Sequence, residues 1–159
     1  MSAPNQNRKY LVTGASGYVG GRLVRALIDE NSDVRILVRD KNKILGQPWS
    51  SQVDICEGSA ENIPDLDRAL AGVHTAFYLL HSINLGPHFD EIESEMARNF
   101  AQAAERAGVS QIIYLGGIAN DSNISKHLAS RAMTGKSLAS TSVAVMELRA
   151  GIIIGSGSA

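Results

Sequence analysis

A glycine-rich segment near the N-terminus, placed between an apolar run and an amphipathic run, limits the fold more than any other part of the chain. Residues 13–20 read TGASGYVG and follow the apolar residues YLV at 10–12. Downstream, Val19, Leu23 and Leu27 recur at helical spacing, which predicts an amphipathic helix. A glycine-rich turn between a strand and a helix presents free N–H groups and the positive end of the helix dipole. The segment therefore predicts a strand–turn–helix unit that binds phosphate.

The three glycines of this segment have distinct expected roles in binding the pyrophosphate of a dinucleotide. Gly14 can take the backbone angles of the tight turn, Gly17 lets the main chain approach the phosphates, and Gly20 allows the helix to pack closely on the strand. A chance glycine-rich turn is the alternative, but the flanking strand and helix, with a second strand ending about 20 residues later, favour the dinucleotide site. The predicted phosphate-binding residues are Gly14, Ser16, Gly17, Tyr18, Val19 and Gly20.

Short apolar runs alternate with amphipathic segments along the rest of the chain. The predicted strands cover about 9–13, 34–38, 53–56, 75–80, 111–115 and 143–148. The predicted helices cover about 18–30, 64–71, 88–107 and 124–139. Strands joined by right-handed helical crossovers form a doubly wound parallel sheet, the Rossmann type of α/β fold. We expect the strand order 3-2-1-4-5-6, with the ligand crevice above strands one and four.

Composition and charge favour an ordinary globular domain. The 159 residues, 44% hydrophobic and 19% charged, suit one domain with a single core. The net charge is -1 and Lys and Arg are not clustered, so we expect neither nucleic acid nor an anionic membrane as a partner. Cys56 is the single cysteine, so we expect no intrachain disulfide, and we expect no metal site. The first ten residues are polar, which makes a cytoplasmic location the default expectation.

The C-terminal end of the chain is strongly apolar until its last few residues. Residues 152–154 are all isoleucine, and GSGSA follows directly at 155–159. We expect residues 1–159 to form the dinucleotide-binding domain of a longer protein; the alternative is a small domain with a frayed tail. We also expect the three isoleucines to be exposed and to favour a homodimer or larger species, or a tail that folds back over the sheet.

The end of the second predicted strand bears on which dinucleotide binds. An acidic residue there bonds the ribose 2′-hydroxyl of NAD, whereas a basic one accommodates the 2′-phosphate of NADP. Arg39 stands in this region, and its guanidinium can form paired charge-assisted bonds to a phosphate. Asp40, the next residue, could serve NAD if the loop turned differently. The sequence therefore favours NADP(H) over NAD(H).

Three further residues are expected to border the crevice. Ser59 follows the third predicted strand and should lie near the adenine. Leu80 and His81 follow the fourth strand, beside the expected position of the nicotinamide ribose. His81 could bond the ribose or a substrate, or be a helix cap or a plain polar loop residue.

Three segments of the chain resemble a known superfamily. TGASGYVG at 13–20 resembles the TGAxGxxG pattern of extended and atypical short-chain dehydrogenases/reductases. VRILVRD at 34–40 is similar to the second strand of NmrA-like NADP-binding relatives, and LRAGIIIG at 148–155 to the LRPGxxxG segment that ends strand six. The resemblance implies a Rossmann fold, a nicotinamide cofactor and an unknown small-molecule substrate, held by a region that follows the cofactor domain.

The superfamily's usual Ser–Tyr–Lys catalytic set is absent from this sequence. The expected tip of strand five reads LGG at 115–117, without a hydroxyl at the serine position, and no Tyr-x-x-x-Lys occurs in the chain. On the following helix, His127 and Arg131 stand where the tyrosine and lysine would be, four residues apart and on one helix face. The resemblance therefore makes these two residues the catalytic candidates.

Two hypotheses about function follow. In the first, the whole protein is an atypical oxidoreductase in which His127 transfers a proton and Arg131 holds the nicotinamide ribose, while this chain alone is inactive. In the second, the domain binds NADP(H) without turnover, as a regulatory sensor of NmrA-like type. A nucleotide-sugar epimerase is a third possibility, although that chemistry normally relies on the missing tyrosine. The structural alternative is an exposed helix histidine and a surface arginine.

Overall fold

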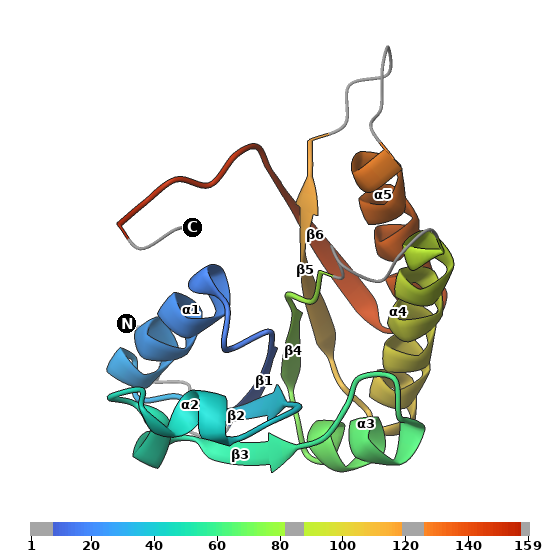
Figure 1. The fold of residues 1–159 in the computed structure, drawn as a ribbon. Coiled ribbons are helices and arrows are strands. Elements are labelled where there is room, and N and C mark those ends of the chain that lie inside the picture. The colour runs from blue at the N-terminus through green and yellow to red at the C-terminus, as the bar shows by residue number, and fades with distance from the viewer. Residues whose placement is uncertain (1–7, 82–87, 119–125, 157–159) are drawn as a thin grey trace, which may run out of the picture.

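Six parallel strands with helices on both faces make up the computed structural model, which describes residues 8–81, 88–118 and 126–156 (Figure 1). The strands are β1 (Lys9–Thr13), β2 (Asp33–Val38), β3 (Asp54–Glu57), β4 (Thr75–Tyr78), β5 (Gln111–Gly117) and β6 (Ala144–Ala150). Their order in the sheet is β3-β2-β1-β4-β5-β6. The predicted doubly wound α/β fold and its strand order are confirmed.

Helices cover both faces of the sheet, one group over each half (Figure 1). They are α1 (Tyr18–Asp29), α2 (Asn42–Leu45), α3 (Ile63–Leu70), α4 (Phe89–Arg106) and α5 (Lys126–Leu138), with a 3-10 turn, η1 (Ser50–Gln52). The chain crosses the sheet in one direction from β1 to β3 and in the opposite direction from β3 to β6. Because the crossovers are right-handed, α1 and α2 lie on one face of the sheet, and α3, α4 and α5 lie on the other. The sequence analysis did not predict α2 or η1, whose four and three residues are too few for a periodic pattern.

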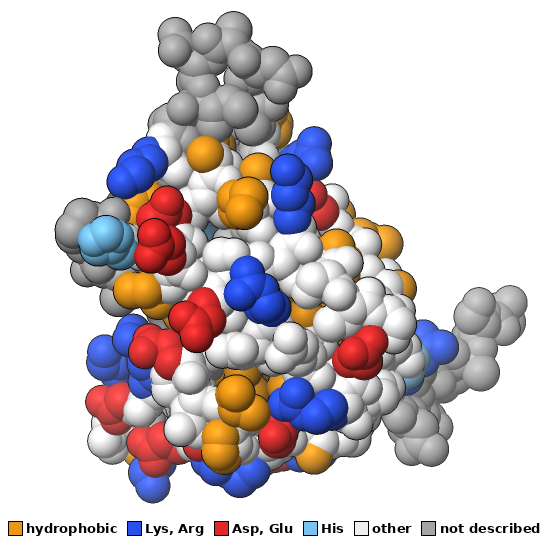
Figure 2. Space-filling view, turned by 90° about the vertical axis from the view of Figure 1, so that its right-hand side faces the viewer, with side chains coloured by type: hydrophobic (Ala, Val, Ile, Leu, Met, Phe, Trp, Pro, Cys, Tyr) orange, Lys and Arg blue, Asp and Glu red, His pale blue; other side chains and the backbone are white. Residues whose placement is uncertain are grey.

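Two hydrophobic cores follow from this arrangement. Under α1 and α2, Val24, Ile36 and Trp49 belong to the smaller core, while the larger one fills the space between the sheet and α3, α4 and α5. In the larger core, the Tyr78 ring meets Phe100 edge-on at 5.0 Å between centroids. On the outer surface of this layer, charged side chains of both signs are interspersed with single hydrophobic ones (Figure 2).

The chain after β6 leaves the sheet and crosses over α1 (Figure 1). Its isoleucines are exposed, as predicted, with 91% of Ile152, 44% of Ile153 and 85% of Ile154 accessible. The tail folds over α1 rather than over the sheet, and the Arg22 guanidinium donates a hydrogen bond of 2.6 Å to the Ser156 carbonyl. Self-association through this surface stays a prediction. Among the described residues, no helix is long and apolar enough to cross a membrane.

The Thr13 side chain holds β1 and β4 together at the point where they separate. The β1–β4 ladder runs from Tyr10 to Val12, whose partner is Phe77. Beyond it, the Thr13 hydroxyl donates to the Phe77 carbonyl at 3.0 Å and accepts from the Leu79 N–H at 3.0 Å. Thr13 is fully buried. Since Leu79 bonds to this hydroxyl and not to the strand ladder, β4 ends at Tyr78, two residues before the predicted end.

We predict that Thr13→Val destabilises the domain, because valine fills the space but leaves the Leu79 N–H without its partner. An unsatisfied buried donor costs about 1–3 kcal/mol. In urea unfolding, the midpoint should fall with little change in slope. The matched control is Thr75→Val, also in a buried strand position, whose hydroxyl bonds the ring of the neighbouring His74. An equal or smaller loss for Thr13→Val than for the control would contradict the role assigned to the Thr13 hydroxyl.

Candidate functional site

A cleft of about 550 Å³ opens along the carboxyl ends of β1, β2, β3 and β4. This volume lies in the usual range for small-molecule sites, about 300–1,000 Å³. In an open α/β sheet, ligands bind at this edge, where the strand order reverses. The cleft is lined by six of the predicted cofactor-binding residues, Gly14, Ser16, Arg39, Ser59, Leu80 and His81, and also by Asp40.

The turn between β1 and α1 requires glycine at two of its positions. Gly14 has a φ of +69°, and a Cβ there would lie 2.7 Å from the Leu79 carbonyl oxygen. A Cβ on Gly20 would overlap the Gly14 carbonyl. At Gly17, in contrast, a Cβ would meet only the Gly14 oxygen, at 3.3 Å. The chain's own packing therefore explains the first and third glycines, and Gly17 has more room for a Cβ than either of them. Gly14 and Ser16 line the cleft, whereas residues 17–20 are not among its lining residues.

The N-terminus of α1 is open to an anion. Gly17 is the N-cap, no side chain caps the helix, and its first turn contains no acidic residue. The first backbone bond of the helix runs from Gly21 N–H to the Gly17 carbonyl. The N–H groups of Tyr18, Val19 and Gly20 precede this bond, so they are available to an acceptor outside the helix. N–H groups of this kind, together with the helix dipole, can bind a phosphate, so binding at residues 18–20 stays a prediction.

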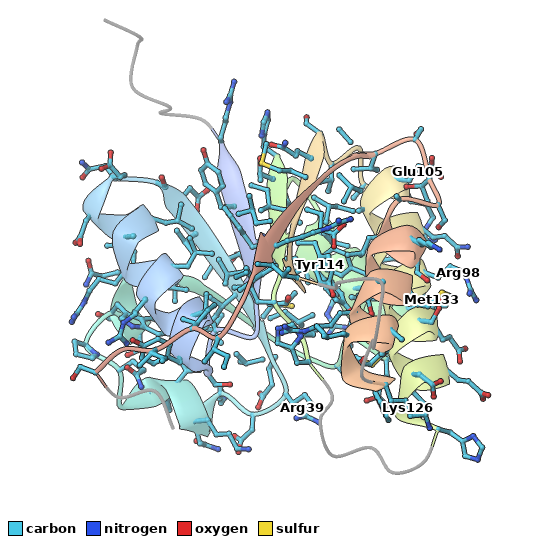
Figure 3. The ribbon with its side chains drawn as sticks, turned by 90° about the horizontal axis from the view of Figure 1, so that it is seen from above. Arg39, Arg98, Glu105, Tyr114, Lys126 and Met133 are labelled. Carbon is cyan, nitrogen blue, oxygen red and sulfur yellow. The ribbon has the colours of Figure 1, made fainter. Side chains whose placement is uncertain are left out.

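At the end of β2, basic side chains line the cleft. Arg39 and Lys43 both face it, and neither forms a salt bridge within the described part of the chain. Arg39 lies between the α1–α2 half and the α4–α5 half of the molecule (Figure 3). The Asp40 carboxylate also borders the cleft, but it accepts bonds of 2.9 Å from both the backbone and the side-chain nitrogen of Asn42. Both bonds end on Oδ1, so one of the two carboxylate oxygens is engaged at the start of α2.

Asp65 fixes the loop that follows β3. Its carboxylate accepts a bond of 2.8 Å from the Ser59 N–H, and this bond, assisted by Arg68, holds the pKa of Asp65 below its usual value. A Cβ on Gly58 would lie 2.8 Å from the Asp65 side chain, so glycine is needed there. The sequence analysis missed Asp65. The Asp65 N–H donates to the side-chain oxygen of Asn62, three residues earlier, and this spacing of residues is a recognisable signal for the start of a helix.

Sequence reasoning also missed Met96, which lines the cleft from α4. It lies on the apolar stripe of this helix, together with the buried Phe89 and Phe100. The same periodicity places all three toward the sheet, and no sequence signal separates the cleft residue from the core residues.

Arg131 and His81 meet at the end of the cleft nearest β5. One terminal guanidinium nitrogen of Arg131, Nη2, lies 2.9 Å from His81 Nε2, and the Tyr114 hydroxyl donates to the Arg131 carbonyl at 3.1 Å. A Cβ on Gly117 would come within 2.8 Å of Leu128 and 3.3 Å of Arg131. The glycine at the tip of β5 therefore makes room for α5. The side chain of His127 lies outside the described residues, and its role stays a prediction.

The ionisation of His81 follows from these surroundings. Although residue 81 as a whole is exposed, its Nε2 faces the Arg131 guanidinium. Lost hydration of the ring, and then the positive charge of Arg131, lower the pKa of His81 to about 4. Nearby, burial raises the pKa of Tyr114 to about 12. At neutral pH the imidazole and the phenol are both uncharged, so the guanidinium is the charged member of this group.

The sequence profile of the NAD(P)H-binding family matches residues 14–150, from the glycine turn to the end of β6. The chain belongs to this family. It is 30% identical over 116 residues, 67% of the chain, to a 3-beta-hydroxysteroid dehydrogenase of Mycolicibacterium neoaurum. It is 32% identical over 117 residues, 71% of the chain, to an undecaprenol-linked N-acetylglucosaminyl 4-epimerase of Escherichia coli O157:H7.

Among solved structures, the NAD(P)H-binding domain is similar to the Citrobacter triphenylmethane reductase complexed with NADP(H). The TM-score is 0.76 at 23% identity, over 89% of this chain and 48% of the reductase. The chain spans 31% and 33% of the two curated relatives and so corresponds to one part of such proteins. The predicted relationship to the extended short-chain dehydrogenases/reductases is confirmed at the family level.

The pKa of His81 predicts a pH dependence of stability. An unfolded histidine has a pKa of about 6.5, above the folded value. As the pH falls from about 7 toward 4, His81 is protonated in the unfolded chain but stays uncharged in the folded domain. The free energy of unfolding therefore decreases. His81→Gln removes this contribution. In urea titrations between pH 7.5 and 4.5, the stability of the unaltered domain should fall relative to that of the variant, whereas parallel profiles would contradict the assignment.

Proposed function

We propose that this domain binds NADP(H) in preference to NAD(H), and that it is the cofactor domain of an oxidoreductase. The observation that carries the preference is the charge at the end of β2. Arg39 and Lys43 line the cleft without a carboxylate partner among the described residues, while Asn42 donates two hydrogen bonds to the Oδ1 atom of Asp40 and so competes with a ribose hydroxyl for this carboxylate. A guanidinium and an ammonium together suit a 2′-phosphate. The similar fold of the Citrobacter reductase, which was solved as a complex with NADP(H), supports this choice.

In this proposal, the cleft holds the dinucleotide along its length. The N–H groups at the start of α1 bind the pyrophosphate, since they are uncapped and the helix begins without an acidic residue. The adenosine half lies toward Arg39 and Ser59, and the nicotinamide half toward Leu80 and His81. The order follows from the rule that the pyrophosphate crosses the sheet where the strand order reverses.

For the reaction we propose reduction of a carbonyl or similar acceptor in the whole protein. Bound NADPH supplies a hydride. His127 gives the proton that the product requires, as an imidazole whose ordinary pKa lies near neutrality. Arg131 holds the nicotinamide ribose, a role supported by its place at the nicotinamide end of the cleft beside His81.

A regulatory, non-catalytic role is the second candidate. It is favoured by one observation, the absence of any Tyr-x-x-x-Lys in the sequence. In that case the domain binds NADP(H) and passes its redox state to a partner, as proposed for NmrA-like proteins. An epimerase, the named activity of one relative, is less well supported because the same tyrosine would be needed.

Calorimetry with NADPH and NADH tests the cofactor preference. We predict tighter binding of NADPH, and we predict that Arg39→Ala weakens NADPH about ten- to a hundredfold while changing NADH little, since hydrogen bonds to charged groups contribute about 1.5–3 kcal/mol. Arg98→Ala is the matched control, because Arg98 is exposed on the outer side of α4 (Figure 3). Equal affinities of the unaltered domain for the two cofactors would refute the preference.

The phosphate-binding turn is tested by Gly17→Val. The φ of Gly17, -83°, is one that valine adopts readily, so the domain should fold, but the branched side chain should occupy the space of the pyrophosphate. We predict that the variant loses the thermal stabilisation by NADPH, which is about 2.7 kcal/mol at 100 times Kd. Gly46→Val, at a surface turn where a Cβ has no neighbour within 4 Å, should retain it. Retained binding in Gly17→Val would mean that the phosphates lie elsewhere.

The role of His127 requires a protein that turns over. We predict that His127→Ala lowers kcat far more than it weakens NADPH binding, because a proton donor acts mainly in the transition state. The rate should depend on a group titrating near pH 6.5, not on a phenol near pH 10. His74→Ala, at the opposite end of β4 from the cleft, is the control. An unchanged kcat in His127→Ala would eliminate this mechanism, and NADPH binding without any turnover would favour the sensor.

A further inference from the structure

The guanidinium of Arg131 is a cation at the nicotinamide end of the cleft that faces an uncharged group. Its Nη2 lies 2.9 Å from Nε2 of the neutral His81 imidazole. Within residues 8–81, 88–118 and 126–156, no carboxylate forms a salt bridge with it. Arg131 is half-buried. A partly desolvated guanidinium gains most from an anionic partner, so this arrangement favours binding of one.

Two acids near His81 and Tyr114 already have partners within the protein. Glu93, on α4, is the acid whose charge acts on His81, and its carboxylate accepts a hydrogen bond from the Ser130 hydroxyl. Glu147, on β6, pairs with Arg149 at 3.2 Å. The uncharged His81 lines the cleft, and the Arg131 guanidinium lies directly beside it.

The chain positions this cation firmly. The hydroxyl of the buried Tyr114 donates a hydrogen bond of 3.1 Å to the Arg131 carbonyl. The tip of β5 lies against the Arg131 side chain, since a Cβ on Gly117 would be 3.3 Å from both Cδ and Nη1 of this arginine. The contact with Arg131 also orders the His81 ring. Arginine only donates, so His81 Nε2 accepts and Nδ1 carries the proton. The Nδ1–H of the imidazole therefore points away from the guanidinium, and Nε2 reports on the state of Arg131.

We propose that Arg131 and His81 form a binding site for an anionic oxygen group, a carboxylate or a phosphate, of a second ligand held beside the nicotinamide. The proposal rests on the proposed function, since it needs the nicotinamide at this end of the cleft. It assigns the Arg131 guanidinium to a second ligand in place of the ribose and identifies that ligand as an acid. A planar guanidinium edge matches the two oxygens of a carboxylate or a phosphate, and the neutral His81 ring beside it adds no competing charge. In the oxidoreductase, the substrate is then an acidic carbonyl compound.

The test uses the NADP+-saturated domain, labelled with 15N in its histidine rings, and titrates it with sodium acetate or with inorganic phosphate. Acetamide, which has the shape of acetate without its charge, is the ligand control. We expect saturable shifts of both His81 ring nitrogens with one or both anions and none with acetamide. Arg131→Gln should weaken anion binding at least tenfold, Arg131→Lys should retain part of it because the charge remains, and Arg98→Gln should leave it unchanged.

The outcomes separate this proposal from the proposed function. If NADP+ binds but neither anion gives a saturable shift of the His81 nitrogens, the anion site is refuted and the cofactor proposal stands. If the anions bind only without NADP+, the pair belongs to the phosphates of the cofactor, and the second-ligand proposal is wrong. If NADP+ does not bind, the cofactor proposal fails, and the same titrations on the free domain still decide whether Arg131 and His81 bind an anion. The anion that saturates at the lower concentration identifies the chemical class.

Discussion

The bonds of the Thr13 hydroxyl to β4 are the interaction on which the cleft depends. Two parallel strands can separate at their carboxyl ends only if the backbone groups beyond the ladder find other partners. Thr13 supplies them for β4 by bonding both the Phe77 carbonyl and the Leu79 N–H. Gly14, with its positive φ and without a Cβ, then lets β1 turn into α1 directly against Leu79. The open edge and the helix N-terminus that faces it come from these two adjacent residues.

The charges along the cleft are arranged on this frame. Arg39 and Lys43 stand at one end, the uncapped N-terminus of α1 in the middle, and Arg131 at the other end. Two acids near these groups accept hydrogen bonds within the protein: Asp40 from Asn42, and Asp65 from the Ser59 N–H. The cleft therefore combines N–H donors and the basic Arg39 and Lys43 with the carboxylates of Asp40 and Glu61. The donors and the two basic side chains are the electrostatic basis for NADP(H) as the proposed cofactor.

The sequence predicted those parts of the molecule that depend on local patterns. A short segment of sequence shows the periodicity of a strand or of the long helix α4, and it shows the backbone requirement of the glycine turn. The strand order follows from the handedness of the crossovers. The contact between His81 and Arg131 could not be predicted, because it joins a loop and a helix that are 50 residues apart. Likewise, the engagement of Asp40 by Asn42 depends on the short helix α2, which has no periodic signal.

The central claim, that a dinucleotide lies across the start of α1, is tested most directly by backbone 1H–15N NMR of the labelled domain titrated with NADPH. We predict that the largest amide shifts fall at Tyr18, Val19 and Gly20, whose N–H groups precede the first helical bond, with further shifts at Ser59. Residues on the outer side of α4, around Arg98, should shift little (Figure 3). Saturable NADPH binding that leaves the amides of residues 18–20 unchanged would contradict the claim.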